Sequence, residues 1–217
     1  MTRMPTPEPR SVKISDDERS GWSSDRPRRP GEPERPPRKL DVSVRGRVLA
    51  PRDRMRYSPG SLLLISSPDE RERERFATRV LDEKSALLTL AKLRTLLRGR
   101  VADDELDGKA QALLDATAGK RLAAGQTVVI VTETLAADER ERYVRMAAAH
   151  RRPRHLVLVE TGPERVEEAD REALKELRTA LDANQLGGEG FATSLRLSGR
   201  IVAELKKIVF APPPADD

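Results

Sequence analysis

The sequence contains no cysteine and very few aromatic residues. The absence of cysteine from all 217 residues excludes disulfide bonds, thiolate catalysis and cysteine-ligated zinc. With aromatic residues at 3%, the core has to be built from leucine, valine, isoleucine and alanine. No stretch approaches the roughly eighteen consecutive apolar residues of a membrane helix, and the N-terminus lacks the apolar segment of a secretion signal. These absences predict a cytoplasmic protein that does not contact a membrane.

The two signs of charge are almost balanced, although charged residues make up 35% of the chain. Lysine and arginine number 41, aspartate and glutamate number 36, and the formal net charge is +5. The isoelectric point of about 9.7 is therefore only a weak indication of a nucleic-acid partner. Nucleic acid stays an alternative partner beside a protein.

Proline and arginine gather before residue 40. Half of the sixteen prolines fall there, in stretches such as "RPRRPGEPERPPRK", with few apolar residues beside them. Such a segment cannot bury enough surface to offset its ordering entropy, which predicts a disordered tail over residues 1–40. The tail either solubilises the protein or tethers an acidic partner through its arginines and Trp22. We expect a folded domain over residues 41–210 and a short C-terminal tail over residues 211–217.

The rest of the chain alternates short apolar stretches with helical patterns. Leu62 to Ile65, Thr127 to Val131 and Leu156 to Val159 are each followed by a helical pattern, as in parallel strands with crossover helices. The sequence therefore predicts an α/β fold, a three-layer domain with a mainly parallel sheet and Leu62 to Ile65 as a central strand. Other expected elements are an edge strand or extended lead-in at 41–49, helices at 104–123, 136–151 and 166–182, a last strand at 191–199 and a final helix at 200–209.

Three motifs carry a family resemblance. They are "LLRGRVADDELD" at 96–107, "GKRLAAGQTVV" at 119–129 and "AADERERYVRMAAAHRRP" at 136–153. In this order and spacing, they make residues 60 to about 197 resemble the P-loop kinase domain of bacterial polynucleotide kinases. The resemblance implies a P-loop fold and descent from enzymes that phosphorylate 5′-OH ends of RNA or DNA.

The phosphate-binding loop of that family is altered in this chain. Where the family has G-x-x-x-x-G-K-[ST], the sequence reads "SSPDERERERFA" over residues 66–77. Serine and glutamates replace the glycines, an arginine replaces the lysine and a glutamate replaces the magnesium-binding hydroxyl; the residues of this degenerate P-loop are Ser67, Glu70, Glu72, Arg73 and Glu74.

This replacement argues against nucleotide binding. A P-loop needs glycine so that its backbone N–H groups can surround the phosphates, and the glutamates would repel them. We expect no nucleotide and no cofactor. The segment should instead start an ordinary helix with Ser67 as its N-cap, supported by pairs of Asp69 with Arg73 and of Glu72 with Arg75.

Other catalytic positions of the family are also lost. Thr95 stands where the resemblance implies the general base, and Val131 stands where it implies a second aspartate, with Glu133 displaced by two residues. The arginine-bearing lid after residues 156–160 looks shortened. These losses predict a pseudokinase, not an enzyme.

The basic positions are better preserved. Arg98 falls on the arginine that, by the resemblance, would grip the acceptor phosphate, and it belongs to a candidate set for phosphate or partner contacts: Arg94, Arg98, Arg100, Lys120 and Arg121. Solvated charges at helix ends are the simpler reading of the same residues. Asp103, Asp104 and Glu105 fit a helix N-terminus, and His150 and His155 are expected at the surface, so we expect no metal site.

Three functions remain open. The first is a non-catalytic adaptor that binds an unidentified protein partner. The second is a nucleic-acid-end binding protein that retains the acceptor groove. The third is an active polynucleotide or small-molecule kinase with an atypical donor site.

Overall fold

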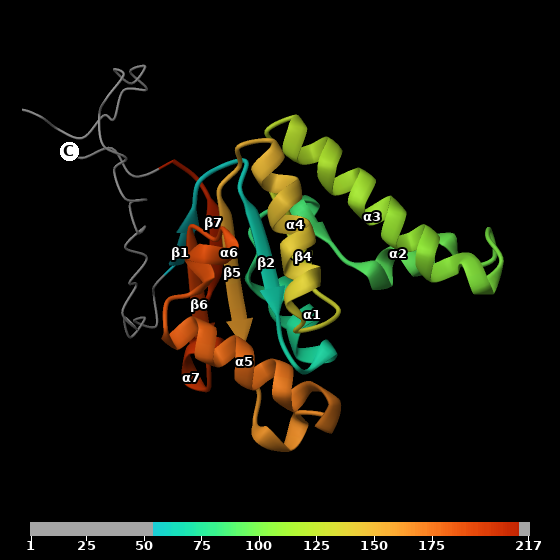
Figure 1. Ribbon diagram of the computed structural model, residues 1–217. Helices are drawn as coiled ribbons and strands as arrows, with labels where there is room; N and C mark the ends of the chain where they lie inside the picture. Colours follow the sequence, from blue (N-terminus) through green and yellow to red (C-terminus); the bar gives the residue numbers. More distant parts are fainter. Residues whose placement is uncertain (1–53, 213–217) are drawn as a thin grey trace, which may run out of the picture. The chain divides into compact units, whose positions relative to one another are not determined.

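The computed structural model describes residues 54–212 (Figure 1). The predicted tail at 1–40, the predicted strand or lead-in at 41–49 and most of the predicted C-terminal tail lie outside these residues. None of the helices within 54–212 is both long and apolar enough to cross a membrane.

A five-stranded parallel sheet forms the centre of the domain. Its strands are β2 (Leu62–Ser66), β3 (Leu87–Leu88), β4 (Val128–Val131), β5 (Arg154–Val159) and β6 (Thr193–Leu197), in the spatial order β3-β4-β2-β5-β6. Leu63 of β2 lies opposite Val129 on one side and His155 on the other. The predicted parallel fold with a central strand from Leu62 to Ile65 is confirmed.

Alternate residues of β2 enter two separate parts of the core. Leu62 and Leu64 pack with residues from α3 (Leu106–Ala123), α4 (Ala137–Ala149) and α5 (Arg171–Asp182). Leu63 and Ile65 pack on the other face with α1 (Glu70–Val80) and α7 (Arg200–Glu204). Because every β2 residue is buried and both faces are covered, the domain has the three predicted layers.

Two short helices and four 3₁₀ turns complete the helical structure. The helices are α2 (Leu90–Leu97) and α6 (Leu186–Glu189), and the turns are Lys84–Ala86, Asp103–Glu105, Pro163–Arg165 and Glu168–Asp170. The predicted helix at 166–182 begins only at Arg171, because the two later turns precede it and Val166 is buried between them. The predicted helix at 104–123 is present as α3 behind its acidic turn.

The C-terminal prediction was wrong in part. The expected final helix at 200–209 stops at Glu204, and residues Lys207–Phe210 form strand β7. This strand pairs in parallel with β1 (Arg54–Tyr57), and Ile208 is completely buried on the α1 face. The β-branched run therefore gains a strand partner and a core position that a surface helix would not provide. The predicted strand at 191–199 exists as β6, but it is not the last strand.

Candidate functional site

The loop between β2 and α1 lies at the carboxyl edge of the sheet. Ser66 ends β2, and Ser67, Pro68 and Asp69 lead into α1. Open parallel sheets bind their ligands at this edge, where the strands end and helices begin. The structure therefore puts residues 66–77, which the resemblance predicts to be a degenerate P-loop, where a phosphate-binding loop would lie.

The side chain of Arg73 closes this loop from inside the fold. It is 7% exposed, and its Nη1 donates a hydrogen bond of 3.0 Å to the backbone carbonyl of Ser67. This hydrogen bond between Arg73 of α1 and the backbone of Ser67 holds the loop against α1. The guanidinium of Arg73 is thus used within the protein, at the position that the resemblance assigns to a phosphate-binding lysine.

Asp69, not Ser67, is the N-cap of α1. Its carboxylate accepts a hydrogen bond of 3.1 Å from the backbone N–H of Glu72. Ser67 was predicted as the cap, but the helix begins at Glu70, and the Ser67 hydroxyl instead accepts from the Asp69 N–H at 3.2 Å. The backbone donors of Asp69 and Glu72 are therefore taken by side chains, and a carboxylate occupies the helix N-terminus.

Uncharged groups join the ends of β2 and β4. The Thr132 hydroxyl donates to the Ser66 hydroxyl at 2.9 Å, and both residues are completely buried. Val131, the residue before Thr132, is also buried and carries no carboxylate. Glu133 turns away to an ion pair of 2.8 Å with Arg94 of α2. The strand ends thus supply no free carboxylate to hold a magnesium ion.

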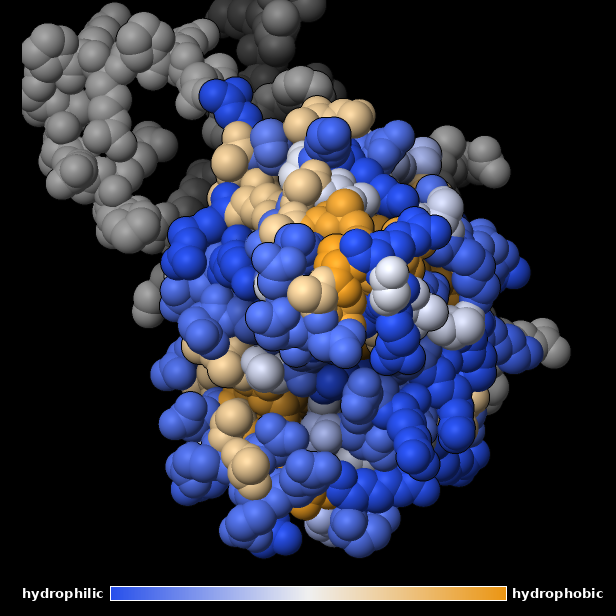
Figure 2. Space-filling view, turned by 90° about the vertical axis from the view of Figure 1, so that its right-hand side faces the viewer, coloured by the Kyte–Doolittle hydropathy of each residue, from blue (hydrophilic) through white to orange (hydrophobic). Residues whose placement is uncertain are grey.

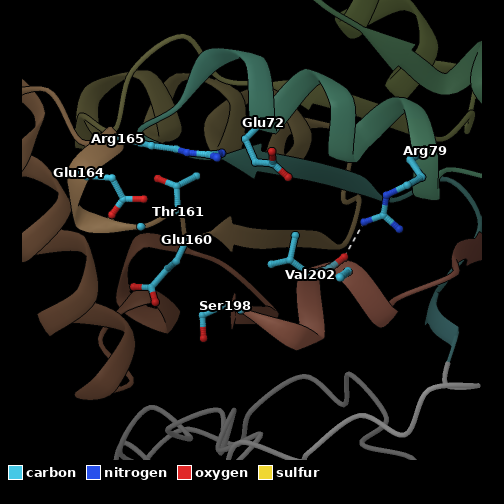
Figure 3. A pocket seen from close by; sticks show the side chains of 11 residues that line it. Glu72, Arg79, Glu160, Thr161, Glu164, Arg165, Ser198 and Val202 are labelled. Atoms are coloured by element: carbon cyan, nitrogen blue, oxygen red, sulfur yellow. Dashed lines mark hydrogen bonds between the residues drawn. The ribbon is translucent and has the colours of Figure 1, made fainter.

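A pocket of about 670 Å³ opens beside the loop (Figure 3). Its walls come from α1, from the segment after β5 and from α7, and its charged lining residues are Glu72, Arg79, Glu160, Glu164 and Arg165. Figure 3 shows the Arg165 side chain extending toward Glu72, and its guanidinium lies 3.9 Å from the Asp69 carboxylate.

Protein groups already engage two of the other charges of this pocket, Arg79 and Glu160. Arg79 donates to the carbonyls of Val202 and Leu205, at 2.5 and 2.8 Å, at the end of α7. Glu160 accepts from Arg178 at 2.5 Å. With carboxylates in the majority and Arg79 used for packing α7, the pocket is poorly suited to a polyphosphate.

A sequence model of the AAA domain family AAA_33 matches residues 60–186, which include this loop and the strands around it. The chain belongs to the AAA domain family. No curated protein shows significant similarity to the chain.

Solved structures with distant similarity accompany this match. One belongs to the PezAT chromosomal toxin–antitoxin system of Streptococcus pneumoniae, with 14% identity, a TM-score of 0.40, and coverage of 62% of this chain and 57% of the other. A putative kinase from Chloroflexus aurantiacus has 12% identity, a TM-score of 0.37, and coverage of 64% and 86%. The tunicamycin resistance protein of Deinococcus radiodurans has 15% identity, a TM-score of 0.36, and coverage of 70% and 99%.

The candidate basic residues lie in different parts of the AAA domain. Arg94 is joined to Asp107 at 2.7 Å as well as to Glu133, so two carboxylates offset its charge. Lys120 and Arg121 lie at the other end of α3, about 20 Å from Asp107 at ~1.5 Å per residue. Arg121 donates to the carbonyl of Ser85 at 2.5 Å. The candidate set therefore does not form one basic cluster.

Arg98, Arg100 and Lys120 are the more available members of the set. All three side chains are exposed and make no ion pair with another residue in 54–212. Arg98 is the C-cap residue of α2. Thr95 is also exposed on α2, but its hydroxyl only donates to the Ala91 carbonyl of its own helix at 2.9 Å. Figure 2 shows the side of the AAA domain on which α2 and α3 lie, where charged side chains surround smaller apolar areas.

Two residues of this domain were misjudged or missed from the sequence. His155 was expected at the surface, but it is 6% exposed. It lies on β5 between the strands β2 and β6, and the ring of Tyr57 from β1 packs against it. Arg165 was not singled out from the sequence, although it lies in the segment after β5, and its guanidinium reaches the Asp69 carboxylate before α1. Among residues 54–212, no group of three or more acidic or histidine side chains could hold a metal ion.

Proposed function

We propose that this AAA domain is a pseudokinase: it binds no nucleotide, transfers no phosphate, and serves as an adaptor for a macromolecular partner. One observation carries the proposal. The loop that would surround phosphates is closed from within, by the bond from Arg73 to the Ser67 carbonyl and by the Asp69 carboxylate at the helix N-terminus.

Electrostatics support the same conclusion. A phosphate beside α1 would meet the Asp69 carboxylate, with Glu70 and Glu72 on the first turn of the helix. Each like-charge contact at about 4 Å costs on the order of one to a few kcal/mol, even with substantial screening. Opening the loop would also break the hydrogen bond of Arg73, so binding would need energy that the site does not supply.

The missing catalytic groups support inactivity independently. Phosphoryl transfer relies on a positioned metal, a positioned base and cations that stabilise the transferring group. Thr95 has no basicity near neutral pH, and Val131 offers no carboxylate. These losses lie on separate elements, α2 and β4, so no single rearrangement of the loop would restore them.

Nucleotide-induced stabilisation tests this proposal against the active-kinase alternative. The full chain is melted with and without ATP or GTP and magnesium, and incubated with labelled ATP and a 5′-OH oligonucleotide. We expect no shift in Tm and no labelled product. A binding nucleotide at a hundredfold its Kd would stabilise the fold by ~2.7 kcal/mol, which would contradict the proposal. Metal-dependent labelling that Arg73→Ala abolishes would contradict it as well.

The second candidate function is binding of nucleic-acid ends. The exposed Arg98 and Arg100 at the end of α2 favour it, because each can neutralise a phosphate. Fluorescence anisotropy with 5′-phosphorylated and 5′-OH oligonucleotides is the direct test. The double variant Arg98→Ala/Arg100→Ala should weaken binding and lower the salt slope by about two, while exposed Arg200→Ala should change neither. Equal oligonucleotide binding by the unaltered chain, the double variant and Arg200→Ala would exclude nucleic-acid binding by the end of α2.

A further inference from the structure

A second pocket lies between strand β1 and the edge strand β6. We call it the strand pocket; its volume is about 710 Å³. Residues of β1 form one wall and residues of β6 form the other, with Leu181, Leu195 and Ile201 among the apolar groups. Ser198 is the one lining residue it shares with the pocket beside the loop. The strand pocket is therefore separate from the degenerate P-loop.

Two buried polar atoms of this pocket, one on Tyr57 and one on His155, have no hydrogen-bond partner within residues 54–212. Tyr57 and His155 are 7% and 6% exposed, and their rings stack with centroids 4.4 Å apart. The Tyr57 hydroxyl and the Nε2 atom of His155 make no hydrogen bond within residues 54–212. Burying such a group without a partner is unfavourable. A fold that keeps two of them next to a pocket retains the means to bind a polar group there.

Both side chains are uncharged at neutral pH. Burial raises the pKa of the Tyr57 phenol, and burial together with the charge of Arg154 lowers the pKa of the His155 imidazole to about 4. Nδ1 of His155 lies 2.8 Å from the Thr193 hydroxyl, which leaves Nε2 as the available ring atom. The pair therefore suits a neutral hydrogen-bonding group better than an ion.

Arginine dominates the charged lining of the strand pocket. Arg54 and Arg56 come from β1 and Arg196 from β6, against one lining carboxylate, Asp182. Asp182 pairs with Arg196 at 3.2 Å, so Arg54 and Arg56 give the pocket its positive excess. Arg54 is exposed, while Arg56 donates to the Pro212 carbonyl. A ligand with an anionic group would meet a favourable charge at this side.

We propose that the strand pocket binds a small organic anion. Its flat apolar body lies between β1 and β6, its neutral polar group bonds to Tyr57 and His155, and its anionic group meets Arg54. This inference does not rest on the pseudokinase proposal, because it uses other residues and requires no phosphate transfer.

The dye 8-anilinonaphthalene-1-sulfonate is a suitable probe, because it combines an aromatic body, an N–H group and a sulfonate. It is titrated into the native full chain while fluorescence is recorded. We expect saturable binding of one dye per chain. Tyr57→Phe should raise the Kd about two- to tenfold, the range of one neutral hydrogen bond, and should also raise Tm because an unpartnered buried hydroxyl is removed. A higher Tm with an unchanged Kd would overturn the proposal.

Three further variants locate the dye. Leu195→Trp should fill the pocket and abolish binding, whereas Leu96→Ser, on the exposed surface of α2, should leave the Kd unchanged. Arg54→Ala should weaken binding about two- to fivefold and remove part of its salt dependence. No dye binding to the full chain, or binding lost with Leu96→Ser and kept with Leu195→Trp, would overturn the proposal.

Discussion

The guanidinium of Arg73 donates a hydrogen bond of 3.0 Å to the backbone carbonyl of Ser67, six residues earlier in the chain. This contact joins the first turns of α1 to the end of β2 without any ligand. In a phosphate-binding loop, the corresponding cation would be directed toward a bound nucleotide. Here the Arg73 guanidinium is instead bonded to the backbone of the loop itself.

Arg73 should therefore contribute to stability rather than to catalysis. Arg73→Ala leaves the buried Ser67 carbonyl without its partner, and we expect a loss of about 1–3 kcal/mol in the free energy of unfolding. Urea denaturation measures the loss. Arg75→Ala is the matched control on the same helix, because Arg75 is 73% exposed and its pair with Glu72 is 4.0 Å long. Equal stability of the two variants would show that the Arg73 contact adds nothing.

Restoring the loop should not restore an enzyme. Glu70→Gly, Glu72→Gly and Arg73→Lys together recreate two glycines and the lysine of the family loop. We expect no phosphorylation of 5′-OH oligonucleotides, because Thr95 and Val131 still supply no carboxylate. Transfer of labelled phosphate is the measurement. Product above the level of the unaltered chain would mean that the remaining positions suffice for the reaction.

Arg94 should act mainly as a connection between α2, α3 and the end of β4. Its ion pairs with Asp107 and Glu133 are 2.7 and 2.8 Å long, and its side chain is 30% exposed. Arg94→Ala should lower the free energy of unfolding by about 1 kcal/mol, with a smaller effect at high salt. Arg98→Ala, about one helix turn further along the chain and without such pairs in 54–212, should be neutral. Thermal unfolding at two salt concentrations checks both.

Stability should fall in acid because of His155. Its pKa is lowered to about 4 in the fold, against 6.5 for the ordinary group, so the unfolded chain binds the proton more tightly. The stabilisation is complete above pH 6.5 and is lost as the pH falls toward 4, by about 2 kcal/mol between pH 7.5 and 5. Urea unfolding at these two values, compared with His155→Gln, isolates the effect. An identical pH dependence of both proteins would contradict the burial of a neutral imidazole.

The central sheet could be predicted from the sequence, because its strands have a recognisable pattern of apolar residues. Leu62 to Ile65 is apolar at every position, as a strand buried on both faces must be, and the helices that follow are readable from their periodicity. Strand β7 was not readable. Its residues continue a helical pattern, and only pairing with β1, about 150 residues away, decides their conformation.

The same distinction applies to the site. The resemblance implies glycines at the positions of Ser67, Glu70 and Glu72 and carboxylates at two other positions, and the sequence itself shows that this chain has other residues there. The hydrogen bond from Arg73 to the Ser67 carbonyl could not be predicted, because charge spacing predicts a pair with the Asp69 carboxylate instead. Contacts between distant segments, such as Arg165 with Asp69 and Tyr57 with His155, depend on the packing of the sheet.

The parallel pairing of β1 with β7 has a mechanical consequence. Arg54 lies opposite Lys207, and Tyr57 lies opposite Phe210, so the chain enters β1 at one end of the ladder and leaves β7 at the other. Tension applied through the two ends of the domain pulls the strands past each other lengthwise. All hydrogen bonds of the ladder then resist at once instead of opening one after another. The β1–β7 pairing should therefore resist a lengthwise pull more strongly than a ladder whose hydrogen bonds open one at a time.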